Sequence, residues 1–440
     1  MLKSLREISQ WEWVLLLFLL PLFLFPQGGR VLVLLVLPIL LLLRRRTFGH
    51  FIPSTPYNAV IFLILAMIGV SLINTFDLGL SLPKIAAMIV GISLMYATVN
   101  FSREQSVWPV VSVLIGIGAA ICLVGLFASN WQPPFEFLNR TRELLPAVPS
   151  QLPGAPGGLI NANELAGVLC WIAPIMLACS FGLQHHLRRR NPALYSLLIT
   201  ITTLAIFLLF ATSSRGGILA FVLSSVLVLA YFTTGQWRLV LAIGLVILTM
   251  AIFTYATNTP DNDIVGDTVG LSGRIEIWSR AILALEDNPL TGVGVNGFRQ
   301  MVHILYPMFG ISSDVDIAHA HNHLLQVGLD LGIPGLVSYL AIWVISAGLV
   351  VVTTRNLLRR KARRNPYYTL VAGLAGSLVG GWIFGIFDAV ALGSRPSFIW
   401  WMVIGLISSV HYAVVHSGRP LKIRQPRTES VTVGPSSYNA

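Results

Sequence analysis

The stretch AHAHNHLLQVGLDLGIPGLVSYLAIWVISAGLVVV, residues 318–352, places three histidines at the start of a long apolar run. From His321 onward it is longer than the about 20 residues that one membrane-spanning helix needs. Gly332, Pro334 and Gly335 interrupt it, and these residue types break or kink helices. We therefore predict a broken helix whose first turns place the histidines in a cavity open to one side of a membrane.

The composition of the whole chain agrees with a membrane protein. Its 440 residues are 55% hydrophobic and 11% charged, with a mean hydropathy of +0.77, whereas soluble domains carry about 25% charged residues. We therefore predict an all-α integral membrane protein with about twelve transmembrane helices. The expected spans lie near residues 11–26, 31–43, 57–74, 83–99, 107–128, 160–183, 194–213, 217–233, 237–256, 323–352, 367–390 and 396–416.

The basic residues predict the orientation, because cytoplasmic loops are enriched in Lys and Arg. With the N-terminus inside, the basic turns at 44–46, 188–190 and 355–364 all fall on the cytoplasmic side. We predict cytoplasmic N- and C-termini, and this topology explains the net charge of +11 without a nucleic-acid partner. The remaining cations fall on the outer side: Arg30, Lys84, Arg140, Arg142, Arg215, Arg274, Arg280, Arg299 and Arg395.

Two long segments are expected outside the membrane. Residues 129–159 are rich in proline and predict an ordered loop or lid, and residues 257–322 form a large extracytoplasmic loop with short helices. Its clearest helix, capped by Ser272 and stopped at Pro289, has an expected apolar face made by Ile275, Trp278, Ile282 and Leu285. Further along, the glycines of residues 373–385 predict a close packing face for a neighbouring helix.

Two arginines are candidates for binding an anion. Arg215 lies in the short turn SSRGG between two spans, where an arginine is costly unless it faces a polar cavity or an anion. Gly216 and Gly217 would let the backbone approach a ligand. Arg274 combines a guanidinium with a helix N-terminus, and both favour an anion. The alternatives are an interfacial arginine and a solvated charge at a helix end.

The histidines allow two interpretations. His319 and His323 share a helical face, which permits a metal site, but no glutamate or cysteine stands beside them. We favour a single histidine that acts as a base, His321, which is followed by Asn322. The pairs Asp261-x-Asp263 and Asp314-x-Asp316 resemble cation ligands but lie in polar loops. We predict no metal and no cofactor, and leave a metal at His319, His323 or these pairs as the alternative.

Five motifs in order carry a resemblance to a known family: NANELAG (161–167), SSRGG (213–217), SGRIEIW (272–278), NPLTGVGVNGF (288–298) and HNHLLQVGLDLGIPGL (321–336). Together they resemble the O-antigen ligase and polymerase family. His321, Asn322, Gly332 and Gly335 match the spacing of that family's main motif. The resemblance covers residues 155–350 well, and the first five spans match it only in hydropathy.

The resemblance implies a GT-C-like, metal-independent, inverting glycosyltransferase. It would transfer a glycan from undecaprenyl diphosphate to a lipid or glycan acceptor on the outer face of the bacterial plasma membrane. The expected organisation is residues 1–156 for helices one to five and the proline-rich loop, 157–416 for the ligase-like membrane domain, and 417–440 for a disordered cytoplasmic tail. The expected partners are the lipid-linked donor, the acceptor and membrane lipids.

The predicted catalytic residues are His321 as base, with Arg215 and Arg274 neutralising the leaving diphosphate. Asn163 and Glu164, at the outer start of one span, and Asp388, at the outer end of another, could bind sugar or pair with an arginine. The predicted substrate-binding residues are Asn322, Asn163, Glu164, Arg280, Arg299 and Lys84. Ligase and polymerase stay open, and a bicarbonate-like transporter is the rival class.

Overall fold

The computed structural model describes residues 11–19, 34–132, 134–144, 159–237, 271–388 and 392–416, together with residues 240, 243, 244 and 247. The regular secondary structure of these residues is helical, apart from one isolated bridge between Ser129 and Ile160. Eight helices are long and apolar enough to span a membrane, so the predicted all-α membrane protein is confirmed while the count of twelve stays a prediction. They are α6 (Leu78–Glu104), α7 (Trp108–Ala128), α8 (Ala162–Gly182), α10 (Pro192–Ala211), α11 (Arg215–Phe232), α15 (His323–Arg359), α16 (Pro366–Phe387) and α17 (Ser397–Val415).

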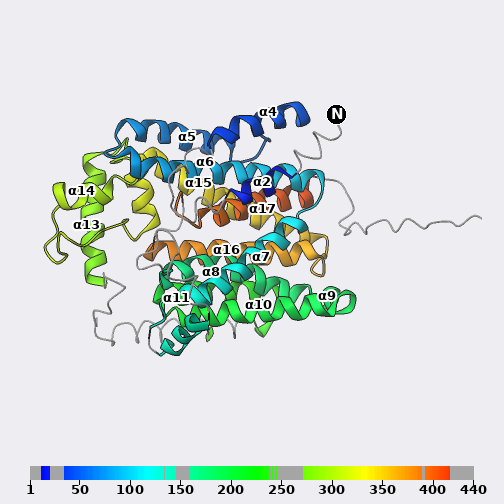
Figure 1. The fold of residues 1–440 in the computed structure, drawn as a ribbon. Helices are drawn as coiled ribbons and strands as arrows, with labels where there is room; N and C mark the ends of the chain where they lie inside the picture. Colours follow the sequence, from blue (N-terminus) through cyan, green and yellow to red (C-terminus); the bar gives the residue numbers. More distant parts are fainter. Residues whose placement is uncertain are drawn as a thin grey trace, which may run out of the picture.

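The shorter elements are α2 (Glu12–Phe18), α4 (Val36–Phe48), α5 (Asn58–Ile73), η2 (Glu136–Leu144), α9 (Gln184–Arg190), α13 (Leu271–Asp287) and α14 (Phe298–Leu305). The long helices run side by side, with α13 and α14 at one end of the bundle and α9 at the other (Figure 1). Several predictions lie outside the described residues. These are Arg30, most of the span 237–256, most prolines of the loop 129–159, the pair Asp261 and Asp263, and the tail 417–440.

Helix α16, orange in Figure 1, packs against α8 and α11 through its glycines. A Cβ atom on Gly380 would lie 2.5 Å from the carbonyl oxygen of Cys170, and one on Gly373 would lie 2.8 Å from the Cα of Ile175. Side chains at these positions would push the helices apart. The predicted glycine packing face is therefore confirmed.

Helix α15, yellow in Figure 1, is broken at Gly332, as predicted. Gly332 has φ 68° and ψ −179°, a conformation that favours glycine and ends the first half of the helix. The backbone groups around the break find partners in the preceding loop: Ile333 N–H donates to Pro289 O (2.7 Å), and Val293 N–H donates to Leu329 O (2.8 Å). The break therefore leaves these groups hydrogen-bonded.

Glycines on both sides make this contact possible. A Cβ atom on Gly332 would overlap the carbonyl oxygen of Leu290, and one on Gly292, at φ 65°, would overlap that of Leu329. The sequence Gly292-x-Gly294-x-x-Gly297 is thus a turn between α13 and α14 whose backbone packs on the break in α15. We call residues 289–293 the sealing loop.

Helix α13 packs against α15 with a face that overlaps the predicted one only in part. Ile277, Ala281 and Ala284 are fully buried, whereas Ile275 and Ile282 are 56% and 46% exposed. The prediction was wrong for Ile275 and Ile282, because large apolar residues and alanines repeat with the same period here. Leu285, from the predicted face, does lie against α15: a Cβ on Gly328 would lie 2.9 Å from Leu285 Cδ2.

The basic turn 44–46 also differs from expectation. Arg44 is 1% exposed and lies inside the bundle, where its Nε donates to Glu12 Oε2 (2.6 Å) and its Nη2 donates to Ser93 O (3.0 Å). Its charge is compensated by a buried carboxylate, whereas Arg45 and Arg46 are exposed as a basic turn requires. Arg44 is therefore a structural cation.

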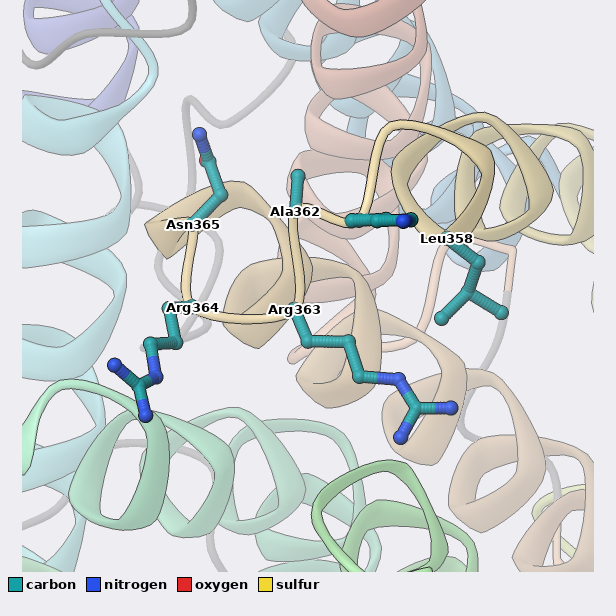
Figure 2. A pocket seen from close by; sticks show the side chains of 6 residues that line it. Leu358, Ala362, Arg363, Arg364 and Asn365 are labelled. Atoms are coloured by element: carbon teal, nitrogen blue, oxygen red, sulfur yellow. The ribbon is translucent and has the colours of Figure 1, made fainter.

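The end of the bundle opposite α13 and α14 is basic. A cavity of about 620 Å³ lies at the turn between α15 and α16. It is lined by Leu358, Lys361, Ala362, Arg363, Arg364 and Asn365 (Figure 2). This is the end that the charge pattern assigns to the cytoplasm. Lys and Arg side chains at a membrane surface are attracted to the phosphates of anionic lipids.

We expect Gly332→Ala to lower the free energy of unfolding by about 2 kcal/mol or more, because the new Cβ meets backbone atoms at a positive φ. Gly348→Ala is the matched control, since it lies in the same helix and no atom lies within 4 Å of its added Cβ. Thermal unfolding of the purified variants measures both. Equal midpoints for the two variants would contradict the account of the break.

Candidate functional site

Three helices begin and one ends at a common point near α13. A side chain caps the first turn of each starting helix: Asn161 accepts from Asn163 N (2.8 Å), Ser214 from Gly217 N (3.2 Å), and Asn322 from Leu324 N (2.9 Å). Asn322 Nδ2 also donates to Ile386 O in the last turn of α16 (3.1 Å). The N-termini of α8, α11 and α15 thus converge on the C-terminus of α16, and helix N-termini favour anions.

A chain of hydrogen bonds joins these ends. Ser214 Oγ donates to Asn163 Oδ1 (2.5 Å), and Asn163 Nδ2 donates to Asp388 Oδ2. Asp388 is 6% exposed, and its Oδ1 lies 3.5 Å from His319 Nε2 and 3.8 Å from His321 Nδ1. We call Ser214, Asn163, Asp388 and His321 the polar chain. It connects α11, α8 and α16 to the residues before α15.

The backbone at His321 takes an uncommon conformation, with φ 47° in the left-handed region. This turn brings the rings of His319 and His321 to a centroid distance of 4.3 Å, and His321 N–H donates to His319 Nδ1 (3.2 Å). His321 Nδ1 is buried and has no hydrogen-bond partner among the described residues. Strain and an unused buried nitrogen together are typical of a functional residue.

The surroundings keep the His321 imidazole neutral. Burial lowers its pKa below the ordinary 6.5, the nearby His319 and Arg274 lower it further, and the Asp388 carboxylate opposes them. At pH 7 the ring therefore carries no charge. One of its nitrogens can accept a proton.

Several predicted residues gather around the polar chain. The charge of Arg274 acts on His321, and Arg215 is the first residue of α11, directly after Ser214. Glu164, in the first turn of α8, interacts electrostatically with Arg395, Asp388 and His319. The structure thus brings together five of the predicted residues, His321, Asn322, Asn163, Glu164 and Arg274, and their roles stay predictions.

The two glycines after Arg215 have another role than the one predicted. A Cβ on Gly216 would lie 3.2 Å from Phe387 Cβ, and one on Gly217 would lie 2.8 Å from Ala166 Cβ. They let the start of α11 approach α16 and α8. Their close contact is with helices, which positions Ser214 and Arg215.

Lys84, Arg299 and Arg280 have protein partners outside the polar chain. Lys84 Nζ lies 2.6 Å from Asp330 Oδ2, and Asp330 is buried within the break region of α15. Arg299 Nε donates to Asp316 Oδ1 (2.7 Å), and the Arg280 guanidinium lies 5.3 Å from the centroid of the Phe309 ring. A role for these three in substrate binding stays a prediction.

The alternative metal pair His319 and His323 is wrong. His323 is 2% exposed and points into the helices, where its Nδ1 bonds Tyr339 Oη (2.8 Å) and its ring lies 5.0 Å from that of Trp382. His319 precedes α15 and faces Asp388 instead. The pair Asp314 and Asp316 also does not converge, because Asp314 accepts from Ser312 while Asp316 binds Arg299.

The predicted residue set lacks Asp388, His319 and Arg395. Asp388 carried a signal in the sequence, because an acid at the end of a span is costly without a partner. Its partner Asn163 lies 225 residues earlier, and no local pattern connects the two. Arg395 is one of the outer cations, and only the fold brings it near Glu164.

We expect Lys84→Met to destabilise the protein by about 3 kcal/mol, because it leaves the buried Asp330 carboxylate without a cation. Lys84→Met/Asp330→Asn should recover most of this loss, since Asn retains the Oδ1 that accepts from Asn296 N (2.9 Å) and Gln326 Nε2 (2.9 Å). The midpoints of thermal unfolding of the two variants measure this difference in stability. If the double variant is no more stable than Lys84→Met, the pair is not a structural one.

The O-antigen ligase family matches residues 198–340, a segment that contains Arg215, Arg274, His321 and the break in α15. No curated protein matches the chain. The match indicates a glycosyltransferase of the O-antigen ligase or polymerase type, acting on lipid-linked glycans in a membrane. Over residues 198–340, the resemblance to the O-antigen ligase family is confirmed.

Proposed function

We propose that the protein transfers a glycan from undecaprenyl diphosphate to a lipid or glycan acceptor on the outer face of the bacterial plasma membrane, with inversion and without a metal. The observation that supports it most is His321, neutral and strained, with its Nδ1 3.8 Å from Asp388. The charge of Arg274 acts on His321, and Arg215 directly follows Ser214 of the polar chain. These contacts support a base with an anion site beside it.

His321 would act as the general base. Its Nε2 accepts the proton of the acceptor hydroxyl while the hydroxyl oxygen attacks the anomeric carbon, and the bond from that carbon to the diphosphate oxygen breaks. The mechanism requires the 3.8 Å separation between His321 Nδ1 and Asp388 Oδ1 to shorten when substrate binds. Asp388 Oδ1 would then accept a hydrogen bond from Nδ1–H, which orients the ring and stabilises the imidazolium as it forms.

The leaving diphosphate gains negative charge as the sugar departs. Fixed guanidiniums can neutralise that charge without a metal, and we assign this role to Arg215 and Arg274. Arg215 begins α11, so the N–H groups of the first turn of that helix add to the anion site. Asn163 supports Asp388, and Asn322 caps the start of α15. We assign the binding of the sugar to Glu164.

Polymerase and ligase use this chemistry in the same way. They differ in the acceptor, which is a second copy of the glycan for a polymerase and a different lipid for a ligase. We keep the ligase as the first candidate because of the spacing from His321 to Gly335. A glycan-transfer assay that offers a different lipid and a second copy of the glycan as competing acceptors separates the two.

We expect the purified protein in liposomes to transfer glycan from an undecaprenyl diphosphate-linked oligosaccharide in the presence of a chelator. His321→Ala should lower the rate by about 10²- to 10⁴-fold, because the general base is lost, and Arg215→Ala should also lower it strongly. His185→Ala, an exposed histidine in α9, is the control. Wild-type transfer that requires an added divalent cation, or no transfer at all, would contradict the proposal.

The pH dependence tests the base. Because the pKa of His321 is lowered from 6.5, its imidazole stays neutral at pH values somewhat below 7. We therefore expect the acidic limb of the pH profile, in which kcat/KM falls as the base is protonated, to lie below pH 6.5. Asp388→Asn removes the carboxylate that raises this pKa, so it should shift the limb to lower pH while reducing the rate at pH 7. A limb above pH 6.5, or one that Asp388→Asn does not move, would show that His321 is not the base.

A further inference from the structure

Three potential metal ligands come together in the site. His319, His321 and Asp388 each offer one atom, and these atoms all lie within 4.8 Å of one another. Asp388 Oδ1 is 3.5 Å from His319 Nε2 and 3.8 Å from His321 Nδ1. Ligands about 2.0 to 2.1 Å from a tetrahedral Zn²⁺ are themselves about 3.4 Å apart. The two separations from Asp388 are therefore close to the spacing that zinc requires.

We infer that His319, His321 and Asp388 form a binding site for Zn²⁺, and that a bound ion inhibits the glycan transfer proposed above. Binding stands on the geometry alone, whereas inhibition rests on the proposed function. Two imidazoles and one carboxylate suit Zn²⁺ better than Mg²⁺ or Ca²⁺, which prefer oxygen ligands. A water molecule or an acceptor hydroxyl would complete the coordination.

A second observation supports a ligand here. His321 Nδ1 is buried and has no hydrogen-bond partner among the described residues, yet it faces Asp388. The other oxygen of Asp388 accepts from Asn163 Nδ2, and such an outer partner fixes the orientation of a metal ligand. The left-handed turn at His321, with φ 47°, keeps both imidazoles on the side of the carboxylate.

The tautomers show what metal binding changes. His319 Nδ1 accepts from His321 N–H (3.2 Å), so its ring proton is on Nε2. Coordination through Nε2 moves that proton to Nδ1 and breaks this long hydrogen bond. A bond between zinc and an imidazole outweighs one neutral hydrogen bond of this length, so the metal-bound tautomer is favoured when zinc is present.

Inhibition follows from the same chemistry. Zinc on Nδ1 of His321 fixes the ring proton on Nε2, which is the nitrogen that must accept the proton of the acceptor hydroxyl. The ion also engages the Asp388 oxygen that orients the ring. Transfer without a metal and inhibition by zinc are therefore consistent properties of one site.

The binding test uses the full-length protein in detergent, freed of metal by a chelator. Zn²⁺ titration calorimetry and the visible absorption of Co²⁺ should both report one tetrahedral site per chain. His319→Asn keeps an acceptor near the Nδ1 position and removes Nε2, so it should weaken binding by at least the 10- to 100-fold that loss of an outer partner causes. His185→Asn, in exposed α9, should bind as wild type does.

Absence of Zn²⁺ binding by the wild type, or equal binding by His319→Asn, would overturn the inference whatever the activity. Zn²⁺ should also stop wild-type transfer reversibly, whereas the fraction of its own metal-free rate that His319→Asn keeps in Zn²⁺ should be near one. Binding to the wild type without any effect on its transfer would overturn the inhibition. If no protein transfers glycan under any condition, the proposed function fails, while calorimetry and the Co²⁺ spectrum still decide the metal site.

Discussion

The structure depends on how the broken backbone of α15 is hydrogen-bonded. At Gly332 the helix stops, and a membrane offers no water for the groups that lose their partners, each of which costs several kcal/mol. The sealing loop donates to Leu329 O and accepts from Ile333 N–H, and glycines on both sides allow backbone to meet backbone. Because the helix breaks, its first turns can end beside α16. His321 then lies near Asp388.

Two buried acids beside α15 differ in what surrounds them. Asp330 pairs with Lys84 and accepts from Asn296 N and Gln326 Nε2, which ties α6 and the loop before α14 to the broken helix. Asp388 faces a neutral histidine that keeps a buried nitrogen without a hydrogen-bond partner among the described residues. Lys84 compensates the charge of the first cluster, which serves the fold. The second cluster contains His321 Nδ1, a buried nitrogen that can still donate a hydrogen bond or bind a metal ion. The proposed transfer and the proposed zinc inhibition both use this nitrogen.

Local signals in the sequence predicted the features that depend on residue type alone. Glycine and proline predict the break in α15, and repeated glycines predict the face of α16. Local signals could not predict contacts between residues that are far apart in the chain. Asn163 and Asp388 are 225 residues apart, and Arg44 binds Glu12 inside the bundle. The predicted buried face of α13 was partly wrong for a related reason, because the period of its apolar residues admits two overlapping faces. Only the neighbouring helix selects the one with Ala281 and Ala284.

The central claim is that the polar chain acts as one unit, with Asn163 working through Asp388 on His321. The most direct test is a double-mutant cycle on the glycan-transfer rate with Asn163→Ala, Asp388→Asn and the double variant. The account predicts that the double variant is no slower than Asp388→Asn alone, because Asn163 has no further role once the carboxylate is gone. Losses that multiply in the double variant would show that Asn163 and Asp388 act independently, and would contradict the account.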